Sequence, residues 1–183
     1  MAAERKPRVV LLDRDGGINE DSPDFVKSVA ELQPIPGSYE AIARLSQAGY
    51  RVLIASNQSG IGRGLFDYDA LFAIHDRIQR AVIELGGRID AIAFAPDHPD
   101  RATEMRKPAP GMLIDLCRRL QVEPGEVCFV GDSMRDIEAA RAAGCRPVLV
   151  RSGNGRRAEA EAGGQLDGVE VHDDLAGFAA SRV

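Results

Sequence analysis

The stretch that most constrains this chain is an apolar run that ends abruptly in two acidic residues. Residues 9–12, Val-Val-Leu-Leu, are followed by Asp13, Arg14 and Asp15 and then by two glycines. A short apolar run with β-branched residues predicts a buried strand, and the glycines predict a turn directly after it. Side chains two apart in an extended chain point the same way, so we expect Asp13 and Asp15 to share one side. Carboxylates are costly there unless a cation or a reacting group uses them, although a solvated loop is the alternative.

Composition narrows the class of protein. The chain has 23 Lys and Arg against 28 Asp and Glu, a formal charge of −5, which disfavours nucleic-acid binding through a general basic surface. No apolar segment is long enough to cross a bilayer, and residues 1–7 are not followed by a signal-peptide pattern. We therefore expect no membrane association and a cytoplasmic location. The length of 183 residues predicts one domain, residues 1–183.

The three cysteines are far apart in the sequence and odd in number, which is a poor basis for disulfides. We expect Cys117, Cys128 and Cys145 to be reduced thiols in the core.

Strand and helix patterns alternate along the chain. Apolar runs predict strands at 9–12, 51–55, 89–95, 127–131, 147–150 and 169–171. Helical spacing predicts helices at 38–48, 67–85, 112–120, 136–143 and 157–161, and a last helix capped by Asp173. This alternation predicts a mainly parallel sheet with helices on both faces. We interpret His75, within 67–85, as a partly exposed helix residue rather than a catalytic group.

Polar residues gather at the carboxyl ends of the predicted strands, where sites form in open α/β sheets. Besides Asp13 and Asp15, this edge collects Ser56, Lys107, Asp132 and Asp136. Several carboxylates suit Mg²⁺, and a lysine and a hydroxyl suit phosphate oxygens. Because no activated serine or cysteine is evident, a carboxylate is the natural covalent nucleophile. The set predicts phosphoryl transfer to an aspartate.

Four motifs in this order resemble those of the haloacid dehalogenase superfamily of phosphohydrolases. They are Asp13-Arg14-Asp15-Gly16, Ser56 at a strand end, Lys107-Pro108, and Gly131-Asp132-Ser133-x-x-Asp136. The resemblance covers residues 8–152 and implies an α/β fold, a three-layer Rossmann-like sandwich. The short connections after the first and third strands leave no room for a large cap domain.

Longer signatures at 13–19, 56–64 and 106–112 are similar to the histidinol-phosphatase-like subfamily, whose members act on small phosphorylated sugars or on histidinol phosphate. The resemblance implies a small phosphorylated substrate. The sequence leaves open which of these two kinds of molecule it is.

The resemblance also implies roles for individual residues. Asp13 would be the nucleophile and Asp15 the general acid and base, while Ser56 and Lys107 would hold the transferring phosphoryl group. Asp13, the backbone carbonyl of Asp15, and Asp132 would bind Mg²⁺. Asp136 would be an auxiliary metal group or simply an acid at a helix start. The implied substrate contacts are Asp21, Ser22, Pro23, Asp24, Asn57, Gln58, Ser59, Arg63 and Arg106.

The chain departs from the family in the loop after the third strand. Many members carry a zinc clip of cysteines and a histidine there, whereas this chain has Ala95-Pro96-Asp97 and Thr103-Glu104-Met105. No sulfur ligand remains, so we expect Mg²⁺ as the cofactor and no zinc.

Two other readings compete with a phosphatase. A receiver domain of a signalling system also uses an acidic Mg²⁺ pocket, but its phosphorylated aspartate ends its third strand, where this chain has Ala95-Pro96. A catalytically inactive relative used for binding would have lost motifs that this chain keeps. We expect a monomeric enzyme.

Overall fold

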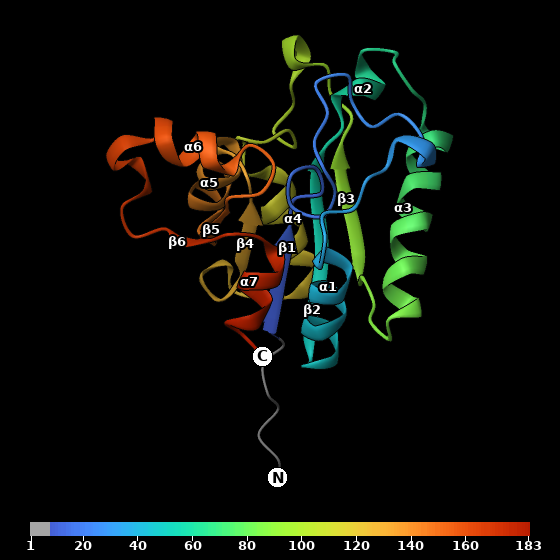
Figure 1. Ribbon diagram of the computed structural model, residues 1–183. Helices are drawn as coiled ribbons and strands as arrows, with labels where there is room; N and C mark the ends of the chain where they lie inside the picture. Colours follow the sequence, from blue (N-terminus) through green and yellow to red (C-terminus); the bar gives the residue numbers. More distant parts are fainter. Residues whose placement is uncertain (1–7) are drawn as a thin grey trace.

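The computed structural model describes residues 8–183, which form a three-layer α/β sandwich (Figure 1). Six parallel strands build the central sheet in the order β3-β2-β1-β4-β5-β6. The strands are β1 (Arg8–Leu12), β2 (Tyr50–Asn57), β3 (Ala91–Ala95), β4 (Cys128–Gly131), β5 (Arg146–Val150) and β6 (Glu170–His172). The predicted fold class is confirmed. The expectation about residues 1–7 lies outside the described residues.

Most of the helices cover the two faces of the sheet, while the short helix after β2 lies at the carboxyl edge (Figure 1). The helices are α1 (Ser38–Gln47), α2 (Ser59–Gly62), α3 (Tyr68–Glu84), α4 (Gly111–Leu120), α5 (Met134–Ala143), α6 (Gly155–Glu161) and α7 (Leu175–Ala180). Single 3-10 turns lie at Val29–Glu31, Pro99–Arg101, Pro124–Glu126 and Gly163–Leu166. The predicted helices agree with these to within a few residues. The short helix α2 was not predicted.

Alternation along β1 divides the apolar core between the two faces. Val10 and Leu12 pack with the buried sides of α1, α3 and α7. Val9 and Leu11 pack on the other face with α4 and α5. Each of these side chains is almost fully buried, and burial of one such side chain contributes about 1.5–3 kcal/mol. The predicted strand is therefore held from both sides, which fixes the position of the acidic residues that follow it.

The carboxyl ends of the strands open onto loops without a covering domain. Within residues 8–183, the connection after β1 holds loops and one 3-10 turn, and so does the connection after β3. This edge lies at the top of the view, near α2 (Figure 1). The expected absence of a large cap agrees with these short connections.

The cysteines occupy the core as reduced thiols, as predicted. All three are buried, and the sulfurs of Cys117 and Cys145 lie 3.9 Å apart. Within the described chain, no helix is both long and apolar enough to span a membrane.

Two predictions about single residues were wrong. The cap of α7 is Asp174 rather than Asp173: its carboxylate accepts a hydrogen bond from the backbone N–H of Gly177 at 2.8 Å. Asp173 instead pairs with Arg151 at 3.0 Å. His75 is 5 % exposed rather than partly exposed, because α3 turns this side chain toward the sheet beside Phe94.

Replacing Asp174 with alanine should lower the free energy of unfolding by about 1 kcal/mol, because the cap hydrogen bond is lost. Urea unfolding measures this change. Asp173→Ala is the matched control and should cost only a few tenths of a kcal/mol, since its ion pair with Arg151 is largely exposed. An equal or larger loss in the control would contradict the assignment of the cap.

Candidate active site

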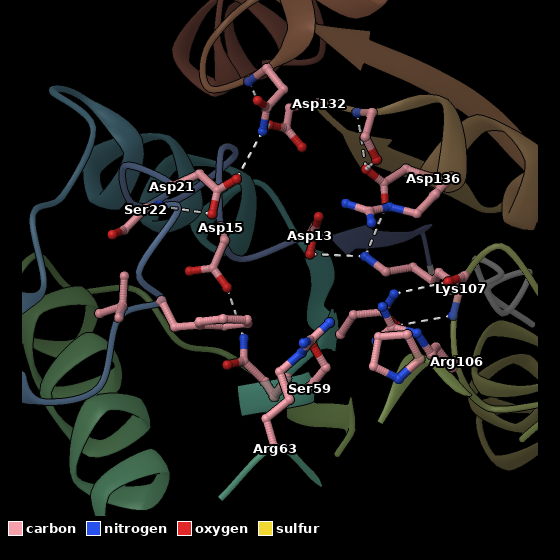
Figure 2. A pocket seen from close by; sticks show the side chains of 18 residues that line it. Asp13, Asp15, Asp21, Ser22, Ser59, Arg63, Arg106, Lys107, Asp132 and Asp136 are labelled. Atoms are coloured by element: carbon pink, nitrogen blue, oxygen red, sulfur yellow. Dashed lines mark hydrogen bonds and ion pairs between the residues drawn. The ribbon is translucent and has the colours of Figure 1, made fainter. Parts of the chain in front are cut away.

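A cavity of about 370 Å³ lies at the carboxyl edge of the sheet and collects most of the predicted residues. Figure 2 shows Asp13 near its centre, with Lys107 and Asp136 to one side and Asp15 to the other. Its walls are lined by Asp13, Asp15, Asp21, Ser22, Phe25, Val26, Asn57, Gln58, Ser59, Arg63, Pro99, Arg106, Lys107, Asp132, Ser133, Arg135, Asp136 and Asn154.

Lys107 is the cation at the floor of this cavity. Its ammonium group lies 2.9 Å from a carboxylate oxygen of Asp13 and 2.7 Å from one of Asp136. It also donates a hydrogen bond to the backbone carbonyl of Ala55 at 3.0 Å, so its three donors have partners. The side chain is only 2 % exposed, and burial alone would lower its pKa. The two carboxylates outweigh burial and raise the pKa of Lys107, which keeps it charged.

Three carboxylates lie together in this part of the cavity, and two of them contact the lysine. Oxygens of Asp13, Asp132 and Asp136 lie within 4.8 Å of one another, and all three residues are buried. With one ammonium among them, two negative charges remain uncompensated when all are ionised. Oxygen donors in this number suit a hard divalent cation such as Mg²⁺. The donor set therefore fits the metal that the sequence predicted.

The pKa values report the same excess of negative charge. Burial and then the nearby Asp136 carboxylate raise the pKa of Asp13 well above its usual value, although Lys107 opposes them. Burial and the same carboxylate raise the pKa of Asp132 to about 6. A divalent cation in this position would favour the ionised form of each acid.

The sequence suggested two alternatives for Asp136, an acid at a helix start or an auxiliary metal group, and the structure is compatible with both. It lies in the first turn of α5, where its carboxylate accepts hydrogen bonds from the backbone N–H and the hydroxyl of Ser133. Its other oxygen faces Lys107 within the acidic cluster. Asp136 is therefore both an acid at the start of a helix and a member of the acidic cluster.

Loops approach Asp132 very closely. The backbone N–H of Asn154 donates to its carboxylate at 2.7 Å. Gly16 and Gly153 have φ angles of 84° and 55°, and a Cβ at either position would collide with the Asp132 carboxylate. Glycine is needed at both positions, because it alone combines this backbone conformation with so close an approach.

Asp15 is held in a different environment from Asp13. Arg14 donates three hydrogen bonds to its carboxylate at 2.8–3.1 Å, and Asn19 and Gln58 each donate one more at 2.8 Å. Burial alone would raise the pKa of Asp15, but the Arg14 charge and these hydrogen bonds outweigh it and lower the pKa. Asp13 and Asp15 flank Arg14 in the sequence, yet the pKa of Asp13 is raised and the pKa of Asp15 is lowered.

The loop after β1 forms one wall, as expected. Asp21 and Ser22 line the cavity, and the Asp21 carboxylate accepts a hydrogen bond from the side chain of Asn154 at 2.8 Å. Pro23 and Asp24 do not line it. They line a neighbouring pocket, which shares Asp21 and Ser22 with the cavity.

Ser56 is placed differently from the other predicted residues. It lies inside β2, is fully buried and does not line the cavity. Its hydroxyl accepts a hydrogen bond from Gln58 at 2.8 Å, and the same Gln58 nitrogen donates to Asp15. In this structure Ser56 lies behind Gln58.

Asn57 supports Lys107 in addition to lining the cavity. Its side-chain amide donates to the backbone carbonyl of Lys107 at 2.9 Å and accepts from the backbone N–H of Lys107 at 3.0 Å. This pair of hydrogen bonds joins the end of β2 to the loop before α4. Asn57 thereby fixes the backbone from which the lysine reaches the carboxylates.

The sequence analysis missed Arg135 and Asn154, both of which line the cavity. Arg135 lies in the first turn of α5, inside the fourth motif. Asn154 follows β5, so the rule that sites form at strand carboxyl ends would have included it. Arg63, Arg106 and Arg135 together give one part of the wall three positive charges, and this crowding, with burial, lowers the pKa of Arg106.

Comparison with known proteins finds relatives over nearly the whole chain. The model of the haloacid dehalogenase-like hydrolase family matches residues 3–144. The chain is 51% identical over 172 residues to the D-glycero-beta-D-manno-heptose-1,7-bisphosphate 7-phosphatase of Bordetella bronchiseptica, covering 94% of this chain and 96% of the relative. It is 48% identical to the protein of the same name from Pseudomonas aeruginosa, covering 94% and 96%.

A solved structure agrees with the fold. The crystal structure of D,D-heptose 1,7-bisphosphate phosphatase from B. bronchiseptica, complexed with magnesium and phosphate, superimposes with a TM-score of 0.93 at 50% identity. The match covers 96% of this chain and 97% of that one.

The raised pKa of Asp132 should appear in the stability of the metal-free protein. Its folded pKa of about 6 lies above the unfolded value of about 3.9, so the folded state holds more protons between these values. Stability contributed by this group is therefore lost as pH rises from 4 to 6. Asp132→Asn should gain, relative to wild type, on the order of 2 kcal/mol between pH 4 and 7.

Urea unfolding in EDTA at several pH values measures this difference. Asp100→Asn, at an exposed position, is the matched control and should track wild type at every pH. A stability difference between Asp132→Asn and wild type that stays constant with pH would contradict the assignment.

Proposed function

Because the chain belongs to the haloacid dehalogenase-like hydrolase family, we propose that it is a Mg²⁺-dependent phosphatase that removes the 7-phosphate of D-glycero-D-manno-heptose 1,7-bisphosphate. The observation that carries this proposal is the cluster of Asp13, Asp132 and Asp136 at the carboxyl edge of the sheet, in which Lys107 pairs with the first and the last of these carboxylates. Residues 1–183 would form one phosphatase domain, located in the cytoplasm and monomeric. This reaction belongs to the supply of heptose precursors for the lipopolysaccharide core.

The carboxylates of Asp13 and Asp132 and the backbone carbonyl of Asp15 would hold Mg²⁺, with Asp136 as an auxiliary group. When bound, the ion supplies positive charge that neutralises the phosphoryl oxygens. Lys107 adds a second positive charge from the floor of the cavity.

In the first step, a carboxylate oxygen of Asp13 attacks the phosphorus and displaces the sugar O7, forming an aspartyl-phosphate. Asp15 gives its proton to the departing sugar oxygen. Its lowered pKa favours the ionised form in the structure, but a phosphate dianion beside it would raise its affinity for a proton. In the second step, Asp15 takes a proton from water as the water attacks phosphorus, which releases phosphate and restores Asp13.

Charge on the cavity wall favours a bisphosphate over histidinol phosphate. Arg63, Arg106 and Arg135 line the cavity in addition to Lys107. Guanidinium groups match phosphate oxygens, so they suit the phosphate that does not react. Histidinol phosphate carries an ammonium group, which these three charges would repel. Histidinol phosphate, or another small sugar phosphate, is therefore only the second candidate substrate, after the heptose bisphosphate.

Asp13→Asn should lower kcat for heptose bisphosphate by at least about 10³-fold, because the amide is a poor nucleophile. Phosphate release measures kcat, and thermal unfolding shows that the variant folds. Asp76→Asn, an exposed carboxylate on α3, should keep wild-type activity. Appreciable turnover by a folded Asp13→Asn protein would refute the proposed nucleophile.

Arg135→Gln should raise KM for the 1,7-bisphosphate by about 10- to 100-fold, since one charged hydrogen bond to phosphate contributes on the order of 1.5–3 kcal/mol. The KM for heptose 7-phosphate, which lacks the second phosphate, should change far less. Arg118→Gln, an exposed residue on α4, removes the same charge at a distant position and serves as the control. Equal increases in KM for both substrates would show that Arg135 does not distinguish them.

We propose that the loop of residues 96–110 functions without zinc. Metal analysis of the purified protein should find less than stoichiometric zinc, and activity lost in EDTA should return with Mg²⁺ alone. One zinc per chain that survives dialysis would contradict this.

A further inference from the structure

Arg14 is a buried cation behind the catalytic edge. Its side chain is 0 % exposed, and its Nε and Nη2 donate hydrogen bonds to Asp15. The remaining nitrogen, Nη1, is buried and has no hydrogen-bond partner within the protein. A guanidinium group has only donors, so Nη1 requires an acceptor. Buried polar atoms of this kind almost always have one.

The neighbours of Arg14 come from the face of the sheet that β1 shares with α1 and α3. Val10 and Leu12 pack on that face, and alternation continues it toward Arg14. The Arg14 charge reaches both His75 of α3 and Tyr39 of α1. Burial and then the Arg14 charge lower the pKa of His75, whereas at Tyr39 the same charge opposes the burial that raises the pKa.

His75 offers the acceptor that Arg14 lacks. It is 5 % exposed, its ring lies 5.9 Å from that of Phe94, and its Nε2 is buried without a hydrogen-bond partner. Burial, together with the Arg14 charge, lowers the pKa of His75 to about 4, so the ring is neutral at pH 7. A neutral imidazole has one donor and one acceptor nitrogen.

We propose that His75 is a positioning residue: its Nε2 accepts a hydrogen bond from an ordered water that in turn accepts one from Nη1 of Arg14, and this bridge holds the guanidinium plane against Asp15. The proposal rests on the proposed function, in which Asp15 is the general acid and base. If the guanidinium could rotate freely, the Asp15 carboxylate could move away from the position in which it gives a proton to the departing sugar oxygen. Small displacements of this kind cost rate rather than ground-state binding.

The tautomer of His75 tests the hydrogen bond in the wild-type protein, without any turnover. Nitrogen NMR of the ring at pH 7 should show a proton on Nδ1 and an unprotonated, hydrogen-bonded Nε2. The signals of the three histidines are distinguished by comparison with the His75→Gln protein. A proton on Nε2 would overturn the proposal, because a protonated nitrogen could not accept the hydrogen bond.

Kinetics test the consequence for Asp15. His75→Phe keeps the aromatic packing and removes the acceptor, and should lower kcat about tenfold or more with KM within twofold of wild type. His75→Gln places an amide oxygen near the position of Nε2 and should recover most of this loss. Tyr39→Phe is the matched control, since it removes a buried hydroxyl that has no hydrogen-bond partner and that the Arg14 charge reaches, and should keep wild-type kcat.

Three outcomes would overturn the proposal: an unchanged kcat in folded His75→Phe, an equal loss in His75→Gln, or a loss confined to Tyr39→Phe. If His75→Phe does not fold, the kcat of His75→Gln and the tautomer of His75 measured by NMR still test the proposal. Absence of turnover by wild type on every phosphate ester would instead refute the proposed function, while the NMR result would still stand or fall by itself.

Discussion

The ion pairs of Lys107 with Asp13 and Asp136 are the interaction on which the rest of the site depends. They join residues that are 94 and 29 positions apart in the sequence and draw the ends of β1, the loop before α4 and the start of α5 together. Burying charges costs free energy that one pair rarely recovers in full. Here the arrangement still leaves an excess of negative charge. The protein thus keeps a strongly polarised site that suits a divalent cation and a phosphate group.

The fold supplies what that cluster requires. A sheet packed on both faces gives β1 little freedom, because alternate side chains are buried in two separate parts of the core. Glycines where loops meet Asp132 allow the backbone to approach its carboxylate. Asn57 connects two loops through the backbone of Lys107. The rigid strand therefore presents the acids, while the loops complete the cavity and carry the residues that would select a substrate.

Asp13 and Asp15 illustrate how the environment divides two identical side chains between two roles. Asp13 lies among carboxylates with one lysine, which raises its pKa. Asp15 lies against Arg14 and two amides, which lowers its pKa. The charge of Arg14 also acts on Tyr39 of α1 and His75 of α3, so this second environment extends to both helices. Residues far from the cavity surface thus belong to the same electrostatic arrangement as those that line it.

Local patterns in the sequence predicted the strands, the helices other than α2, the order of the motifs and the edge at which they meet. These depend on local patterns: a period of two along a strand, helical spacing, and polar residues after apolar runs. The three-dimensional packing placed Ser56 behind Gln58, brought Arg135 into the cavity, and buried His75. The physical reason is that a local period tells which face of an element is apolar, whereas contact between distant side chains depends on the order and packing of all the elements. The cap of α7 shows the same limit at short range, since Asp173 and Asp174 are identical residues and the backbone conformation alone decides which one caps.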